Sequence, residues 1–157
     1  MLPVAPPAVG ASPYPAVAAF ATNPLLIDLR ELLADGLLTT DELAAAELPA
    51  GARVDFGAVH QAKHAALLRA FERFSAKSAL KQELDSYAQG ESAWLEDYAL
   101  FSALHAAHGD QPWTEWPEAL RDRAPAALKK AKKEKAAAVE LHKFTQWLFD
   151  RQWAKLR

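Results

Sequence analysis

Proline is crowded into the first 27 residues of this chain, and that placement limits the fold more than any other feature of the sequence. The prolines of this stretch are Pro3, Pro6, Pro7, Pro13, Pro15 and Pro24. Each proline removes a backbone donor and pushes the preceding residue out of the α region. We therefore predict that residues 1–27 form an extended or polyproline-like arm, which lies over other elements and does not support itself.

Helical patterns fill the rest of the chain. Asp28 and Glu31 have the spacing of a capping box, and Thr39 and Glu42 repeat it. Apolar residues then recur at near-helical intervals. The predicted helices cover 28–36, 39–46, 55–74, 78–88, 92–107 and 125–157, with a loop of at most one helical turn over 110–124. The predicted fold class is all-α: an irregular helical bundle, a single folding unit over 28–157, preceded by the extended Pro-rich arm and ending in a long C-terminal helix.

The last predicted helix has two halves of different character. Lysines crowd the first half and large apolar residues the second: Lys129, Lys130, Lys132, Lys133 and Lys135, then Leu141, Phe144, Trp147, Leu148, Phe149, Trp153 and Leu156. A helix that is apolar on several faces is normally buried on several faces. We expect a domain of this size to leave part of that surface open, which points to a partner, another domain or removal from a larger protein.

Composition excludes several function classes. A formal net charge of -2 gives no electrostatic case for nucleic acid or anionic lipid, and the absence of Cys excludes disulfides, thiolate catalysis and Cys-based zinc sites. No apolar run approaches the roughly 20 residues that cross a bilayer. The start of the chain lacks a charged region and is interrupted by proline, so we predict no signal peptide. We expect a cytoplasmic protein without cofactors, with no nucleic-acid or membrane partner, that is a monomer or associates weakly with itself.

Generic functional signals are weak. Two histidine pairs have helical spacing: His60 with His64, and His105 with His108. No third ligand accompanies either pair, so we predict partly exposed helix histidines and no metal site. The adjacent Glu96 and Asp97 diverge by about 100° on a helix, which suits an ion pair or a cap at Asp97 better than a paired acid and base. The lysine run lacks interleaved aromatic residues and is predicted to be a solvated face. The five tryptophans could stack on sugars, but helical spacing favours the core.

Longer strings carry a more specific signal. They are SPY at 12–14, AFATNPLLIDL at 19–29, WLEDYALFSALHAAHG at 94–109, QPWTEWPEALRDR at 111–123 and HKFTQWLFDRQW at 142–153, with LP at 2–3 and VDFG at 54–57. In this order and spacing the chain resembles the 4-α-glucanotransferase family, also called amylomaltases or disproportionating enzymes. The resemblance covers essentially the whole chain but only part of the family protein.

The resemblance implies a specific place in a larger enzyme. That family is built on a (β/α)8 barrel with α-amylase-type chemistry, and this segment resembles a helical insertion between two barrel strands. The family's catalytic carboxylates lie in barrel motifs that this sequence does not contain, so we expect no catalytic residue here. The family's SPY loop lines the donor side of the cleft, which implies substrate contact at Ser12 and Tyr14. Tyr14 would stack on a glucose ring and bond through its hydroxyl, or, in the alternative interpretation, pin the arm to the helices.

Departures from the family pattern share one direction: polar and glycine positions are occupied here by Ala, Pro or Val. The family loop GPTGYGDSPYQS is replaced by APPAVGASPYPAV, so its tyrosine falls at Val9, its acidic or amide residue at Ala11 and its glutamine at Pro15. A second glucan site of the family uses aromatic residues at the position of Val9 and near His60, and neither is kept. Ala and Pro reduce the entropy of the unfolded chain where the backbone permits them.

Two function classes remain open. The first is an insertion subdomain excised from such an enzyme, with redesign as an open alternative, which is inactive without the missing barrel domain and makes at most weak contact with maltooligosaccharides. Because the ends of an insertion leave the host together, Met1 and Arg157 are then expected to lie close to each other. The second is a stand-alone helical scaffold or protein-interaction module that pairs through its last helix.

Overall fold

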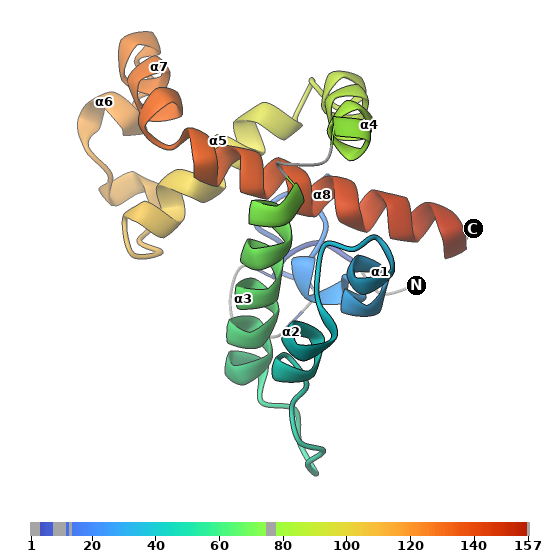
Figure 1. Ribbon diagram of the computed structural model, residues 1–157. Helices are drawn as coiled ribbons and strands as arrows, with labels where there is room; N and C mark the ends of the chain where they lie inside the picture. Colours follow the sequence, from blue (N-terminus) through green and yellow to red (C-terminus); the bar gives the residue numbers. More distant parts are fainter. Residues whose placement is uncertain (1–3, 8–11, 13, 75–77, 157) are drawn as a thin grey trace.

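The computed structural model describes residues 4–7, 12, 14–74 and 78–156, and every regular element within those ranges is a helix (Figure 1). The helices are η1 Pro24–Leu26, α1 Leu29–Ala34, α2 Thr40–Ala45, α3 Phe56–Phe74, α4 Ser78–Gly90, α5 Leu95–Ala107, η2 Trp113–Glu115, α6 Glu118–Arg121, α7 Pro125–Glu134 and α8 Ala136–Leu156. The predicted all-α class is therefore confirmed. No helix in the described part of the chain is long and apolar enough to cross a membrane. The predicted approach of Met1 and Arg157 lies outside the described residues.

The arm folds back on itself before it reaches the helices. The Val17 N–H donates to the Pro6 carbonyl at 3.0 Å, and the Asn23 N–H donates to the Val4 carbonyl at 2.7 Å. A single antiparallel bridge accompanies these bonds within the described residues of the arm, between Pro7 and Ala16. These two backbone hydrogen bonds join separate parts of the arm to each other, which the proline content did not predict.

Two glutamines of α8 then bind the backbone of the arm. The Gln146 amide accepts from the Thr22 N–H at 2.8 Å and donates to the Thr22 carbonyl at 2.9 Å. The Gln152 amide does the same for Asp28, at 2.8 and 3.0 Å. Each side chain satisfies one backbone donor and one acceptor, as a neighbouring strand would. We call these contacts the amide clamps, and they fix the arm along α8.

Local capping fixes the short helices that follow. Asp28 begins α1 by accepting the Arg30 N–H at 2.9 Å. Thr39 and Glu42 form a reciprocal capping box at the start of α2, as predicted. Gly36 ends the first of these helices with a φ of 66°, a conformation that glycine adopts at little steric cost.

Helix α8 is the axis of the main core. Its residues 143–149 are all buried, because the arm, α3, α4 and α5 pack around it. Phe144 is fully buried, with its ring 4.8 Å from that of Phe74 and 5.8 Å from that of Trp147. The expected open apolar face is therefore absent from the middle of the helix. It is confined to the end, where Leu156 is 79% exposed.

The predicted single helix over 125–157 is wrong, because α7 ends at Glu134 and α8 begins at Ala136 (Figure 1). The break is at Lys135, whose φ of -106° and ψ of 17° lie outside the α region. Neither Gly nor Pro marks this position in the sequence. The break lets the lysine-rich half turn toward α5 and α6, while the apolar half enters the main core.

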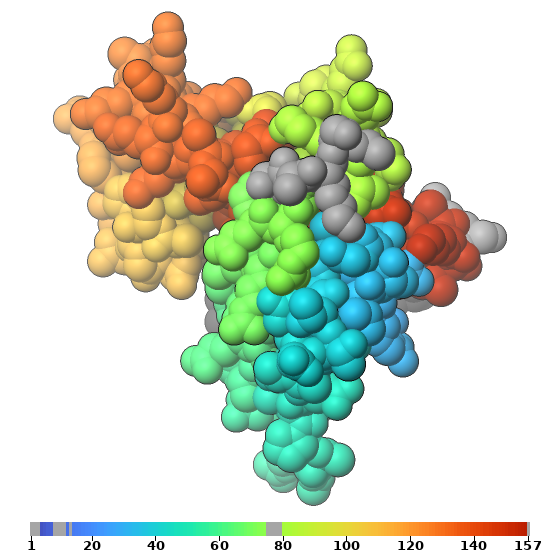
Figure 2. Space-filling view, viewed as in Figure 1, coloured from blue at the N-terminus to red at the C-terminus, as the bar shows by residue number. Residues whose placement is uncertain are grey.

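The described residues therefore divide into two packed regions. The main lobe consists of the arm, α1–α4 and α8. The α5–α7 lobe consists of α5, η2, α6 and α7, is centred on Leu104, Trp116 and Ala131, and stands out from the rest in Figure 2. The two lobes are joined where α5 packs along α8, the most extensive contact between two helices in the described part of the chain, and Ala99, Ala103 and Val139 are buried in it.

Candidate functional site

A cavity of about 380 Å³ lies between the arm, α3 and α8, and we call it the arm cavity. Its lining residues are Pro6, Pro7, Asn23, Pro24, Leu25, Phe56, His60, Lys63, His64, Leu67, Leu141, His142 and Thr145. Its size is typical of small-ligand sites, and its walls are largely apolar. Its position beside the arm makes it the first candidate for the function that the arm was predicted to have.

One lysine holds the wall of this cavity that η1 forms. Lys63 of α3 donates from Nζ to the carbonyl oxygens of Leu25 at 2.6 Å and Ile27 at 2.5 Å. These bonds tie η1 to α3, while the Asn23 side chain accepts the Leu25 N–H at 3.0 Å and caps η1. Burial lowers the pKa of Lys63. This ammonium therefore serves the backbone of the arm and has a structural role.

Three histidines supply polar groups to the cavity: His60, His64 and His142. His60 and His64 stack at 6.0 Å between ring centroids, on successive turns of α3. Burial, and then the neighbouring His64, lowers the pKa of His142 to about 4. Burial and the neighbouring His60 also lower the pKa of His64. At neutral pH, His64 and His142 are uncharged and offer one donor and one acceptor each. The described residues contain no group of three side chains able to hold a metal ion.

The two residues predicted to contact substrate lie on the surface of the arm. Ser12 is exposed, and Tyr14 is 74% exposed. Neither is among the described residues that line the arm cavity. A side chain as open as Tyr14 does not bury against the helices, so the alternative interpretation, in which Tyr14 pins the arm, is wrong. The amide clamps fix the arm, and no periodic pattern in the sequence identified those glutamines.

The remaining candidates are engaged in surface ion pairs. Glu96 lies between the ammonium groups of Lys132, at 2.5 Å, and Lys143. Burial raises the pKa of Glu96, but these two lysines outweigh it and hold that pKa below its ordinary value. Asp97 pairs with Arg123 at 2.8 Å, which confirms the predicted ion pair.

The second histidine pair is occupied by aromatic and ionic contacts. The His108 ring stacks on Trp116 at 5.2 Å. His105 meets Asp110 at 3.0 Å between ring nitrogen and carboxylate. Both histidines therefore support the α5–α7 lobe.

Catalytic potential can be judged from the carboxylates. The described lining of the arm cavity includes none, and a second cavity, in the α5–α7 lobe, includes Asp97 alone. Retaining transfer between sugars needs two carboxyl groups about 5–5.5 Å apart across the bond. The fold and its cavities therefore define a helical segment with polar groups set in apolar cavities, and with no facing carboxylates in the described part of either lining.

Comparison with known proteins identifies the family. The family model described as 4-α-glucanotransferase matches residues 1–157. The chain is 45% identical to a 4-α-glucanotransferase of Thermus thermophilus and 36% identical to one of Synechocystis, over 100% of the chain in both cases. The chain belongs to the 4-α-glucanotransferase family. It spans 31% and 32% of those two relatives, or about a third of their length.

A solved structure agrees with this assignment. The amylomaltase of Streptococcus agalactiae in complex with acarbose superposes with a TM-score of 0.90 at 26% identity. The match covers 98% of this chain and 31% of that one. The helical arrangement described above is therefore shared with part of an amylomaltase.

Proposed function

We propose that this chain is the helical, substrate-contacting part of a 4-α-glucanotransferase that transfers α-1,4-glucan chains. The observation that carries the proposal is the arm: the amide clamps hold it on α8 at Thr22 and Asp28, the Val17–Pro6 hydrogen bond holds it nearer to Tyr14, and Tyr14 stays 74% exposed. An exposed aromatic ring on a fixed backbone is preorganised for a sugar ring. In this proposal the rest of the enzyme supplies the barrel and the catalytic carboxylates, and the protein acts in the cytoplasm.

The proposal includes that the chain alone is inactive. Its support is the scarcity of carboxylates in the described linings of the two cavities. Maltotriose incubated with the pure chain is expected to give no glucose and no longer maltooligosaccharides in a chromatographic assay. If disproportionating activity copurifies with the chain and disappears when the chain is removed, the proposed inactivity is wrong.

Substrate contact at Ser12 and Tyr14 is tested by titration with maltoheptaose. Amide signals of these residues are expected to shift, and Tyr14→Ala is expected to abolish the shift, while Tyr14→Phe retains the ring and part of the effect. The matched control is Phe20→Ala, which removes another exposed aromatic ring of the arm that lies outside the described linings of both cavities. Unchanged arm signals at saturating sugar would refute the contact.

The origin that we propose is excision of the helical insertion subdomain from such an enzyme, either unaltered or redesigned. A complementation experiment tests whether the chain can act within its host. The chain is mixed with the remaining part of the Thermus thermophilus relative, to which it is 45% identical. Recovered disproportionation supports an excised, functional part. A mixture in which that relative's own segment restores activity and this chain does not favours a redesigned one.

A second candidate function rests on apolar residues that remain open. Leu26 is 54% exposed and Leu156 is 79% exposed, beside a shallow cavity that also includes Trp153. This surface suits a scaffold or interaction module that pairs with itself or with another protein. Light scattering after size-exclusion chromatography separates the two functions, because a monomer at all concentrations removes self-association.

A further inference from the structure

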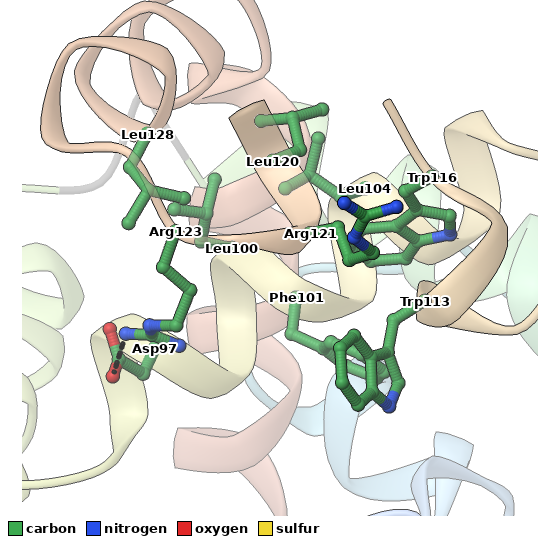
Figure 3. Close-up of a pocket in the computed structure, with 10 residues that line it drawn as sticks. All are labelled: Asp97, Leu100, Phe101, Leu104, Trp113, Trp116, Leu120, Arg121, Arg123 and Leu128. Carbon is green, nitrogen blue, oxygen red and sulfur yellow. Dashed lines mark hydrogen bonds and ion pairs between the residues drawn. The ribbon is translucent and has the colours of Figure 1, made fainter. Parts of the chain in front are cut away.

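A second cavity, of about 320 Å³, lies in the α5–α7 lobe, and we call it the lobe cavity (Figure 3). Helix α5 supplies one wall, Trp113 of η2 and Trp116 directly after it supply the tryptophans, and the chain from α6 to α7 supplies the rest. Its described lining shares no residue with that of the arm cavity. No contact of the proposed enzyme function uses it.

The aromatic wall of this cavity is fixed before any ligand arrives. Trp116 is buried, its indole N–H donates to the Gln111 carbonyl at 3.1 Å, and its ring stacks on Phe101 at 5.5 Å. Trp113 lies one short helical turn earlier, and its carbonyl accepts the Trp116 N–H at 3.2 Å. Trp113 is 52% exposed, so this lining residue has a backbone fixed by the turn and a side chain that borders solvent.

The polar rim is charge-balanced. Asp97 pairs with Arg123 at 2.8 Å, and Figure 3 shows this pair on the side of the cavity away from Trp113. Arg121 pairs with Asp122 at 2.9 Å. The side chains of Asp97 and Arg123 are 70% and 64% exposed, so both keep hydrogen-bonding capacity toward solvent. A rim with paired charges gives little net attraction for an anion or a cation, but it offers acceptors and donors together.

This combination suits a neutral ligand that has one apolar face and a hydroxyl-bearing edge. A pyranose ring presents axial C–H groups to an aromatic ring and vicinal hydroxyls to a carboxylate and a guanidinium. We infer that the lobe cavity binds one or two units of a neutral α-1,4-glucan, with a sugar ring on Trp113 and its hydroxyls on Asp97 and Arg123. The choice of an α-1,4-glucan among sugars rests on the proposed function, whereas the site itself rests on the cavity.

Maltoheptaose titration of the whole chain tests the inference through signals separate from those of the arm. We expect the Trp113 indole N–H and the Asp97 and Arg123 amides to shift together. Trp113→Ala is expected to lower the apparent affinity for maltoheptaose, followed at the Asp97 and Arg123 amides, at least about tenfold. Trp113→Phe is expected to retain most of the binding. Phe20→Ala is the matched control and should change nothing at this site.

A second pair of variants keeps the test independent of folding at Trp113. Asp97→Asn retains a hydrogen-bond acceptor and a similar shape, whereas Asp97→Leu removes both the negative charge and the hydrogen-bond acceptors. We expect the first to retain binding within a few-fold and the second to lose it, with both chains showing the same far-UV circular dichroism as the parent.

Three outcomes would overturn the inference. The first is arm signals that move with maltoheptaose while the Trp113 signals stay fixed, a result that leaves the proposed function intact. The second is an equal response at Trp113 to cellopentaose, whose β-linkage gives a different chain shape. The third is a concentration-dependent dimer that Trp113→Ala dissociates, which would assign the cavity to a second copy of the chain. Fixed arm signals with shifts at Trp113 would refute the arm contact and support the lobe cavity.

Discussion

The two lobes of this molecule are built from the same kind of helix but are stabilised differently. The main lobe has an aromatic centre in which Phe74, Phe144 and Trp147 lie 4.8 to 5.8 Å apart. The α5–α7 lobe has Trp116 as the one aromatic residue among the three buried at its centre. Some of the other interactions in the α5–α7 lobe are exposed ion pairs, such as that of Asp97 with Arg123, and such pairs contribute little to stability.

This difference predicts that the two lobes differ in stability. Apolar burial is the main stabilising term of a fold, so the main lobe is expected to carry most of the free energy of unfolding. A region with few buried apolar residues opens locally at lower cost. The α5–α7 lobe is therefore expected to open locally at lower cost than the main lobe, which holds the arm in place.

The largest expected effect is at the centre of the main lobe. Phe144→Ala should lower the free energy of unfolding by about 3–5 kcal/mol, because it leaves a cavity between α3 and α8. Urea denaturation followed by circular dichroism measures it. The comparison variant is Trp116→Ala, which should accelerate amide exchange in the α5–α7 lobe and leave the main lobe protected. If the two variants lose protection over the same residues, the lobes are one cooperative unit and the contrast is wrong.

Acid should destabilise the main lobe through His142. This histidine is uncharged in the folded chain down to a pKa of about 4, against 6.5 for its ordinary value. The unfolded chain therefore binds a proton below pH 6.5 that the folded chain does not bind, and stability falls between pH 6.5 and 4 by about 3 kcal/mol. The groups that face His142 are His64 of α3, whose pKa is also lowered, and Tyr98 of α5.

Thermal unfolding between pH 7 and 4 measures this effect. Glu42 has its pKa lowered to about 2 by Arg73 and adds its own loss of stability below pH 4.5, so the profile of the parent chain is a sum. His142→Gln is the matched variant, and the difference between the two profiles isolates the histidine. Parallel profiles for parent and variant would contradict the assignment.

The amide clamps should each have a smaller effect. Gln146→Met keeps the volume of the side chain but leaves the Thr22 N–H and carbonyl without their partner, at a cost of roughly 1–3 kcal/mol. Gln152→Met removes the same bonds at Asp28, in a less buried place, and should cost less. Chemical denaturation ranks the two. An arm whose amides exchange no faster in Gln146→Met would show that the clamp does not hold it.

The smallest effect is expected at the rim of the lobe cavity. Asp97→Asn breaks an exposed ion pair with Arg123 and should lower stability by roughly 0.2–1 kcal/mol at low salt. Added salt should shrink the difference, since exposed charges are screened. Denaturation at low and high ionic strength checks it. A loss that exceeds that of Gln146→Met would mean that the α5–α7 lobe depends on this pair.

Local signals in the sequence predicted local structure well. The capping box of Thr39 and Glu42 formed because it needs only residues three apart. The break at Lys135 could not be predicted, since no Gly or Pro marks it and the contacts of α7 with α5 and α6 that accompany it are not local in sequence. The amide clamps join residues 124 positions apart, so no local pattern contains them. The predicted loop over 110–124, with at most one helical turn, is wrong, because it contains both η2 and α6. Only the structure shows that Trp113 borders a cavity.

The spacing of the clamps has a consequence for the length of the arm. Three contacts share one sequence offset of 124 residues: Thr22 with Gln146, Asp28 with Gln152, and Glu31 with Lys155. The arm and α1 therefore run parallel to α8 in constant register, although α8 rises only about 9 Å over six residues and an extended arm would span about 20 Å. The η1 turn shortens the arm to fit. An insertion or deletion between residues 22 and 28 would shift one clamp off its partner, whereas the exposed connection over 48–54 can change in length freely.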